Sequence, residues 1–194
     1  MVSALDPALL VRAYRDGIFP MAVEGGEIAW FSPDPRGVIP LDAFHLPARL
    51  ARVLRSGRFE IAADRAFEGV MRACADRRGE GTWISEEIVQ AYLALHRLGL
   101  AHSIETWRDG QLVGGLYGVH IGAAFFGESM FHRETDASKA ALAALVDRLT
   151  RRGFRLLDVQ WLTPHLAQFG AVEIPRRTYL AKLKRALEVD CSFS

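Results

Sequence analysis

The sequence predicts a single domain that mixes helices and strands, of the α+β or the α/β class. Its length of 194 residues is that of one ordinary domain. Half of the residues are apolar and 24% are charged, which suits a packed core and is not typical of a disordered chain. The order of patterns decides the class, because helical signals fill most of the first half and strands alternate with helices in the second.

The first half of the chain is expected to be mainly helical. Asp6-Pro7 supplies an N-cap and a first turn, and Gly17 ends that helix. Asp64 is expected to cap a later helix, and Ser85, followed by two glutamates, is expected to cap another. The expected helices cover residues 6–17, 47–57, 64–76 and 85–99.

A loop and one short strand lie between these helices. Pro33 and Pro35 stand too close together for either a helix or a central strand, so residues 32–37 are expected to turn. Residues 59–61 are expected to form a short strand.

The middle of the chain is expected to be a β-meander. Residues 102–107, 111–120 and 123–132 form three strand-like segments rich in glycine and aromatic residues. Asp136 is expected to cap a helix that Gly153 ends. A buried strand over residues 154–161 follows, and then helices over 163–169 and 175–187.

Composition and charge exclude several classes of protein. Lys plus Arg is 24 and Asp plus Glu is 23, so the net charge of +1 lacks the basic excess typical of nucleic-acid binders. Two cysteines, Cys74 and Cys191, are too few for a disulfide framework or a four-thiolate zinc site. No signal-peptide pattern is present, and no uncharged run reaches the roughly 20 residues of a membrane-spanning helix. We therefore expect a soluble cytoplasmic protein without membrane contact.

Common enzyme signatures are absent from the sequence. It contains neither G-x-x-x-x-G-K-[ST] nor G-x-G-x-x-G, which argues against a phosphate-cradling loop and against a dinucleotide site. It also lacks the G-x-S-x-G elbow of serine hydrolases. Its six histidines show no H-x-x-x-H spacing and no accompanying acidic cluster, so no metal site is expected.

Polar residues inside apolar strands are the first functional candidates. Asp158 and Gln160 alternate in one buried strand and therefore are expected to share a face. Glu128 follows Gly127 in an aromatic run. A carboxylate in such a place is unfavourable unless it is paired or used. Two structural alternatives stay open, in which Asp158 accepts hydrogen bonds as a buried cap and Glu128 pairs with an arginine.

A tryptophan and two groups of basic residues are the second set of candidates. Trp83 lies in a loop with Gly79 and Gly81, where its ring is available to stack on a base, although most tryptophans pack in a core. The basic groups either form solvated helix faces or contact an RNA backbone. They comprise Arg49, Arg52, Arg55 and Arg58, and then Arg176, Arg177, Lys182, Lys184 and Arg185.

Nine ordered segments give the chain a resemblance to a known family. They are residues 14–20 (YRDGIFP), 30–36 (WFSPDPR), 81–84 (GTWI), 102–105 (HSIE, before Trp107), 112–119 (LVGGLYGV), 127–131 (GESMF), 137–139 (ASK), 158–160 (DVQ) and 170–177 (GAVEIPRR). On these segments, which span nearly the whole chain, the sequence resembles the leucyl/phenylalanyl-tRNA–protein transferase family.

The resemblance implies an architecture and a reaction. It implies an α+β fold, with an acetyltransferase-like (GNAT) mixed sheet and flanking helices over residues 36–194 and a small N-terminal domain over residues 1–35. We expect this N-terminal domain to be reduced, because the family pattern upstream of Asp6 is not found in the sequence. The implied donors are Leu-tRNA, Phe-tRNA and, less well, Met-tRNA, each bound by its 3′ end. The implied acceptors are proteins with N-terminal Lys or Arg, and the product carries an N-terminal degradation signal. No cofactor is implied, because the aminoacyl ester is already activated.

The resemblance also assigns residues to the site. It maps the catalytic pair onto Asp158 and Gln160. Gln160 would accept a hydrogen bond from the attacking amine through its amide oxygen, and Asp158 would orient it or steady positive charge on the amine. Glu128 maps near the substrate, where it would meet the acceptor's cationic side chain or an amine. The pocket for the donor side chain would be lined by Leu116, Phe125, Met130, Leu142 and Leu157.

The 3′-terminal adenine of the tRNA would be bound by two further residues. Trp83 matches one adenine-contacting tryptophan of the family. Met21 stands where the family often has a second tryptophan, so the stacking is expected to be weaker here.

Three alternatives to this function are considered. An acyl-CoA acetyltransferase would need a glycine-containing pyrophosphate loop, whereas residues 132–138 contain two acids and no glycine. A peptidoglycan-type aminoacyl-tRNA-dependent transferase shares the implied fold and donor but not the N-terminal segments quoted above. A non-catalytic RNA-binding module would leave Asp158 and Gln160 unexplained.

Overall fold

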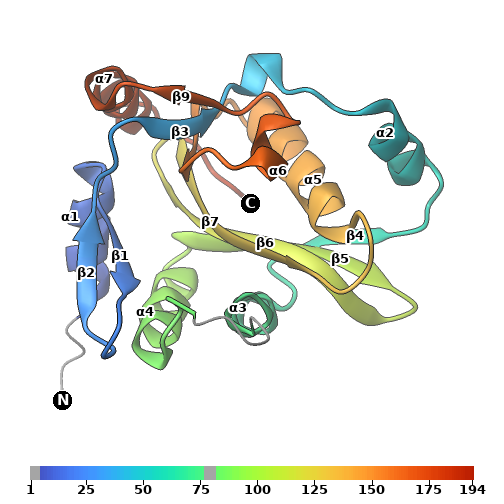
Figure 1. Cartoon of the computed structure of the whole chain (residues 1–194), viewed down its shortest axis with the longest axis horizontal. Coiled ribbons are helices and arrows are strands. Elements are labelled where there is room, and N and C mark those ends of the chain that lie inside the picture. Colours follow the sequence, from blue (N-terminus) through green and yellow to red (C-terminus); the bar gives the residue numbers. More distant parts are fainter. Residues whose placement is uncertain (1–4, 77–81) are drawn as a thin grey trace.

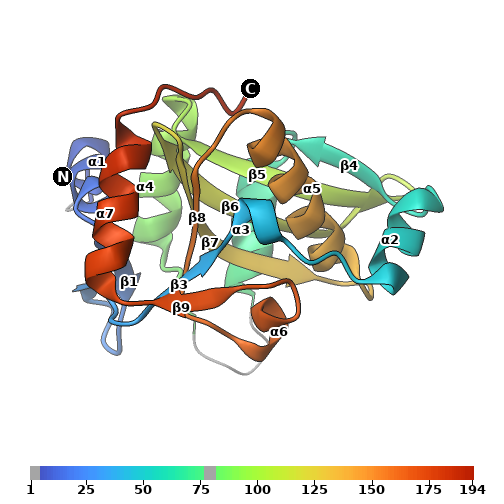
Figure 2. The same ribbon diagram turned by 90° about the horizontal axis from the view of Figure 1, so that it is seen from above.

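The fold combines one large mixed sheet with helices on both of its faces (Figures 1 and 2). The computed structural model describes residues 5–76 and 82–194. Within these residues a seven-stranded sheet has the order β4-β5-β6-β7-β8-β3-β9, and β1 and β2 form a separate two-stranded sheet. The expected α+β class, with a mixed sheet and flanking helices, is therefore confirmed.

The strands of the large sheet are short at its edges and long in its middle. The bounds are β3 (Arg36–Ile39), β4 (Glu60–Ala63), β5 (Ala101–Arg108), β6 (Gln111–Ile121), β7 (Ala124–His132), β8 (Leu156–Gln160) and β9 (Val172–Ile174). The predicted meander is confirmed as β5, β6 and β7, which pair antiparallel.

One parallel pairing shapes the middle of the sheet. β7 and β8 run parallel, and their register covers only residues 124–126 of β7 and 156–158 of β8. Just beyond it, the register between β6 and β7 shifts where Gly118 pairs with Gly127 and Tyr117 with Ser129, which leaves Glu128 as an extra residue. Such a bulge bends a strand and re-aims its side chains. β7 and β8 stop pairing at Phe126 and Asp158, two residues before Glu128 and Gln160.

The helices cover the two faces of the sheet. They are α1 (Pro7–Arg15), α2 (Ala48–Arg55), α3 (Phe67–Ala75), α4 (Glu86–Arg97), α5 (Ala137–Arg151), α6 (Pro164–Ala167) and α7 (Arg176–Leu187), with a 3₁₀ turn at Leu41–Ala43. In Figure 1, α3 and α4 lie below the sheet, and α5 and α6 lie above it. The side chains of Asp6 and Ser85 cap α1 and α4 as predicted, by accepting from the backbone N–H groups of Leu9 and Ile88.

The N-terminal segment shares its core with the rest of the molecule. β1 (Phe19–Ala22) and β2 (Ile28–Phe31) form a hairpin beside α1. The buried side chains of Leu10, Tyr14 and Phe19 belong to the same apolar cluster as residues of α3, α4, β6 and β7. The hairpin is thereby fixed against the large sheet.

The structure corrects the prediction for residues 32–37. β3 begins at Arg36, directly after Pro35, and lies inside the sheet between β8 and β9. The prolines exclude a strand only at their own positions, because the residues after them have free N–H groups. Gly37 is required there, since a Cβ atom would lie 2.7 Å from the carbonyl carbon of Trp161. β1, β2 and β9 were not predicted either.

Two predicted caps have other roles. The N-cap position of α3 is Ala66, and Asp64 accepts instead from the backbone N–H of Ser103 at 2.8 Å. Asp136 stands at the N-cap position of α5 but makes no capping hydrogen bond, and its carboxylate contacts Lys139 at 3.1 Å. The sequence pattern located both helices correctly without identifying what these carboxylates bind.

A search of the described residues for a membrane-spanning segment finds no helix of sufficient length and apolar character.

Candidate active site

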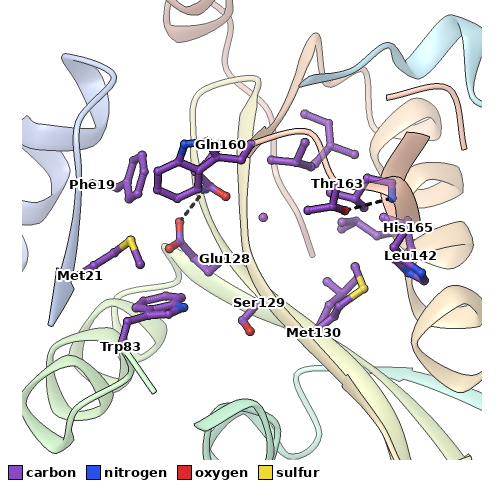
Figure 3. Close-up of a pocket in the computed structure, with 17 residues that line it drawn as sticks. Phe19, Met21, Trp83, Glu128, Ser129, Met130, Leu142, Gln160, Thr163 and His165 are labelled. Carbon is purple, nitrogen blue, oxygen red and sulfur yellow. Dashed lines mark hydrogen bonds between the residues drawn. The ribbon is translucent and has the colours of Figure 1, made fainter. Parts of the chain in front are cut away.

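A cavity of about 410 Å³ opens where β7 and β8 separate (Figure 3). One wall comes from β7, through Gly127, Glu128, Ser129 and Met130. The opposite wall comes from the end of β8 and the residues after it. Helix α5 and the hairpin of β1 and β2 contribute the remaining sides. The residues just beyond the last β7–β8 pair, among them Glu128 and Gln160, thus line the cavity.

Eight of the ten predicted site residues line this cavity. They are Met21, Trp83, Leu116, Glu128, Met130, Leu142, Leu157 and Gln160. Gly79 and Gly81, quoted in the loop before Trp83, lie outside the described residues. The segments that supply these eight side chains are far apart in the sequence, and the fold alone brings them together.

Phe125 does not line the cavity, which corrects its assignment to the donor pocket. Its side chain is fully buried and stacks on Phe193, with ring centroids 5.5 Å apart. The ring also fills the space over Gly118, where a Cβ atom would lie 2.4 Å from Cε1 of Phe125. Phe125 is therefore a core residue behind the pocket.

Asp158 does not line the cavity either, because its carboxylate is completely buried against Arg36. Arg36 Nε donates to Oδ1 at 2.9 Å and Nη2 donates to Oδ2 at 2.7 Å. The Tyr179 hydroxyl donates to Oδ2 at 2.7 Å. The guanidinium also lies over the rings of Phe19 and Tyr179. Burial, reinforced by the Asp158 charge, raises the pKa of Tyr179 above its ordinary value, so its hydroxyl remains a donor.

Asp158 acts on Gln160 through the backbone. The Gln160 N–H donates to Asp158 Oδ1 at 2.9 Å. Gln160 has a φ of 59°, a left-handed conformation that is uncommon for a residue other than glycine. Residues held in such conformations persist where the surrounding contacts determine them. Of the two predicted roles of Asp158, orienting Gln160 fits this placement, whereas direct contact with an amine in the cavity does not.

Glu128 is held by two tyrosines and by Gln160. Tyr14 Oη donates to Oε1 at 2.8 Å and Tyr92 Oη donates to Oε2 at 3.4 Å. The two hydroxyl groups also contact each other, so their two hydrogens are shared among three contacts. Gln160 Nε2 donates to Oε1 of Glu128 at 3.3 Å. Burial raises the pKa of Glu128 to about 8, despite the Tyr14 hydrogen bond, which favours the charged form.

The cavity has two ends on either side of a polar pair, as Figure 3 shows. Trp83 and Met21 lie at one end, and Met130, Leu142 and His165 lie at the other, with Glu128 and Gln160 between them. The backbone N–H of Ala22 donates to the carbonyl of Trp83 at 3.1 Å, which ties the hairpin to the Trp83 loop. An elongated ligand would therefore pass the polar pair in its middle.

Several cavity and support residues were missed by sequence reasoning. The additional lining residues are Phe19, Gly127, Ser129, Leu145, Val159, Trp161, Thr163, His165 and Leu166. Tyr14 and Arg36 stand inside segments that carried the family resemblance, yet no role was assigned to them. Their position inside those segments was the available signal, but only the fold shows which carboxylates they bind.

Except for Arg58, which follows α2, the residues of the two basic groups lie on exposed faces of α2 and α7. Arg49 lies 3.7 Å from Asp136, and Arg58 lies 2.9 Å from Glu134. Arg176 donates to the Ser32 carbonyl at 2.9 Å. Contact of either group with RNA stays a prediction.

Comparisons with known proteins agree over the whole chain. A family model described as leucyl/phenylalanyl-tRNA protein transferase matches residues 38–184, and the model of that family's N-terminal domain matches residues 3–34. A leucyl/phenylalanyl-tRNA–protein transferase of Gloeobacter violaceus is 56% identical over 194 residues, with 100% of both chains covered. That of Rubrobacter xylanophilus is 56% identical over 191 residues, covering 98% of this chain and 99% of the relative.

Among solved structures, a GCN5-related N-acetyltransferase-like protein of Streptococcus suis is similar with a TM-score of 0.42 and 17% identity. The similarity covers 86% of this chain and 63% of that one.

Proposed function

The chain belongs to the leucyl/phenylalanyl-tRNA protein transferase family and is an aminoacyltransferase, and on this premise we propose its substrates and the roles of its site residues. The donor is Leu-tRNA or Phe-tRNA and, less well, Met-tRNA. The acceptor is a protein with an N-terminal Lys or Arg, in the cytoplasm, and the product carries an N-terminal degradation signal. The observation that carries this proposal is the match to relatives of that name over their entire length.

The proposed reaction is an aminolysis of an ester. The neutral α-amino group of the acceptor attacks the ester carbonyl carbon, a C–N bond forms, and the C–O bond to the tRNA ribose breaks. One amine proton leaves, and the ribose oxygen gains one. The ester is already activated, and a free α-amino group has a pKa of about 7.7–8.0, so part of it is neutral at physiological pH. Alignment of amine and ester is then the main contribution of the enzyme.

Gln160 is proposed to receive the amine. Its Nε2 donates to Glu128, so its amide oxygen is the atom left to accept a hydrogen bond in the cavity. An amide oxygen is not a base, but a hydrogen bond from the attacking N–H directs the nitrogen lone pair toward the carbonyl carbon. Gln160 is therefore the catalytic residue of the pair, and Asp158 is a positioning residue that acts through the Gln160 backbone.

Glu128 is proposed to meet the cationic group of the acceptor. Its pKa of about 8 is close to that of the incoming amine, so a proton can pass between the two with little change in free energy. Tyr14 and Tyr92 donate to it from the core side, which fixes the carboxylate and leaves Gln160 as its partner on the cavity side.

The two ends of the cavity are proposed to hold the two ends of the aminoacylated adenosine. The adenine stacks on Trp83 and contacts Met21, and the donor side chain enters the apolar end, where Met130 and Leu142 lie. Leu116 and Leu157, which also line the cavity, are proposed to contact the same side chain. Methionine adapts its shape readily, which suits a pocket that accepts both leucyl and phenylalanyl groups. We also propose that residues 1–35 form the small N-terminal domain and residues 36–194 the catalytic domain.

The decisive experiment uses radiolabelled Leu-tRNA with one peptide that begins with Arg and a matched peptide that begins with Gly. Label is expected on the Arg peptide alone. Label on both peptides would overturn the acceptor assignment. No transfer to either, with tRNA binding retained, would overturn the proposed donor and acceptor pair and favour an RNA-binding role.

A further inference from the structure

An unpartnered nitrogen lies at the apolar end of the cavity. Among the described residues, Nε2 of His165 is buried and has no hydrogen-bond partner. Its side chain lines the cavity together with Leu142, Leu145 and Leu166, and Figure 3 places it beside Leu142, at the end away from Trp83. Buried polar groups in native proteins nearly always have a partner. An open one in a binding cavity therefore points to a ligand atom.

The second ring nitrogen of His165 indicates which atom carries the hydrogen. Gln168 Nε2 donates to the backbone oxygen of His165 at 2.8 Å and lies 3.4 Å from Nδ1. Nδ1 is thus the acceptor, and Nε2 bears the hydrogen. Burial, and then the charges of Lys139 and His132, lower the pKa of His165. At neutral pH the apolar end therefore presents a neutral N–H donor.

We propose that His165 sets the ranking of donor amino acids by directing this N–H at the tip of the donor side chain. The inference rests on the proposed function, in which that side chain occupies the apolar end. A thioether sulfur accepts a hydrogen bond weakly, and the face of a phenyl ring accepts one more weakly. Leucyl methyl groups accept none, so a leucyl tip beside Nε2 leaves the N–H unpaired.

Removal of the N–H should consequently shift selectivity toward leucine. For His165→Leu we expect the ratio of kcat/KM for Met-tRNA to that for Leu-tRNA to fall roughly fivefold, the effect of one net hydrogen bond. The ratio for Phe-tRNA against Leu-tRNA should fall less. His165→Gln, which keeps an N–H donor, should retain the wild-type ratios more closely. His45→Leu, at an exposed histidine outside the cavity lining, is the matched control and should change neither ratio.

The experiment measures competitive transfer from the three charged tRNAs to the Arg peptide. A second variant, His165→Val, guards against misfolding of the first, and thermal melting checks both. Affinities for non-hydrolysable amide analogues of leucyl- and methionyl-adenosine are measured by calorimetry with the same proteins. A lowered Met/Leu ratio in transfer or in affinity supports the inference.

Unchanged ratios, or an equal loss for all donors, would overturn it. Absence of transfer by the wild-type protein would instead refute the proposed function. The analogue affinities would then decide the role of His165 separately.

Discussion

Replacing Arg36 should damage the protein as much as replacing Asp158, although neither residue is part of the cavity lining. The exposed fractions of their side chains are 1% and 0%, and two hydrogen bonds of 2.9 and 2.7 Å join them. Removing one partner of such a pair leaves a buried charge without compensation, which destabilises a protein by about 3–5 kcal/mol. Total stabilities of about 5–15 kcal/mol make this a large loss.

The prediction is best measured as a double-mutant cycle in urea unfolding. Arg36→Met and Asp158→Leu should each lower the free energy of unfolding by about 3–5 kcal/mol. The double variant should be less destabilised than the sum of the two, because it removes both charges. Arg151→Met is the surface control, since the side chains of Arg151 and Asp147 are 77% and 58% exposed, and it should change stability by less than about 1 kcal/mol.

A comparison of the transfer activities of these variants distinguishes a positioning role of Asp158 from direct catalysis. If Asp158 acts only by holding Gln160, folded Arg36→Met should lose transfer activity in parallel with Asp158→Leu at a temperature where both are native. A folded Arg36→Met enzyme with full activity, beside an inactive Asp158→Leu enzyme, would refute this reasoning. It would mean that Asp158 serves the reaction independently of its buried partner.

The remaining predictions concern the cavity itself. Gln160→Ala should lower kcat for transfer while aminoacyl-tRNA affinity stays near wild type, and equal losses in both would contradict its role. Trp83→Ala should weaken donor binding by about 1–3 kcal/mol, the contribution of stacking on one base. Met21→Trp should strengthen donor binding. Titration with charged tRNA measures both affinities. Burial raises the pKa of Glu128 to about 8, so protonated Glu128 stabilises the folded protein fully below about pH 4.5. This contribution to the free energy of unfolding is lost as the pH rises through about 8. In Glu128→Gln the free energy of unfolding should fall less steeply with pH, by at most about 1.4 kcal/mol per pH unit. Parallel plots of unfolding free energy against pH for the two proteins would contradict this expectation.

The elements that sequence analysis predicted correctly are those that carry their signals locally. Asp6 and Ser85 cap helices a few residues away, and the strands of the meander follow one another with short turns. The strands that it missed have only three or four residues each. β1 and β2 pair with each other in a hairpin, whereas β3 and β9 pair with segments distant in the sequence. β3 is the clearest case, because Gly37 pairs with both Gln160 and Glu173. No local pattern specifies such partners.

The candidate site shows the same division. Residue types and the family resemblance identified Glu128, Gln160 and Trp83, and the structure brings all three to one cavity. Asp158 was selected for the same reason, but its role depends on Arg36, which lies 122 positions earlier in the chain. Periodicity predicts on which face a side chain lies, whereas the identity of its partner follows only from the tertiary fold.

One buried guanidinium links the two halves of the proposed site. Arg36 Nη1 donates to the carbonyl of Gly17 at 3.0 Å, directly before the hairpin that carries Met21, while its other nitrogens hold Asp158. Asp158 in turn holds the backbone of Gln160. The hairpin and the amide that faces the attacking amine therefore share a common support. The proposed transfer needs the adenine and the ester carbonyl at a fixed separation, which this shared support would maintain.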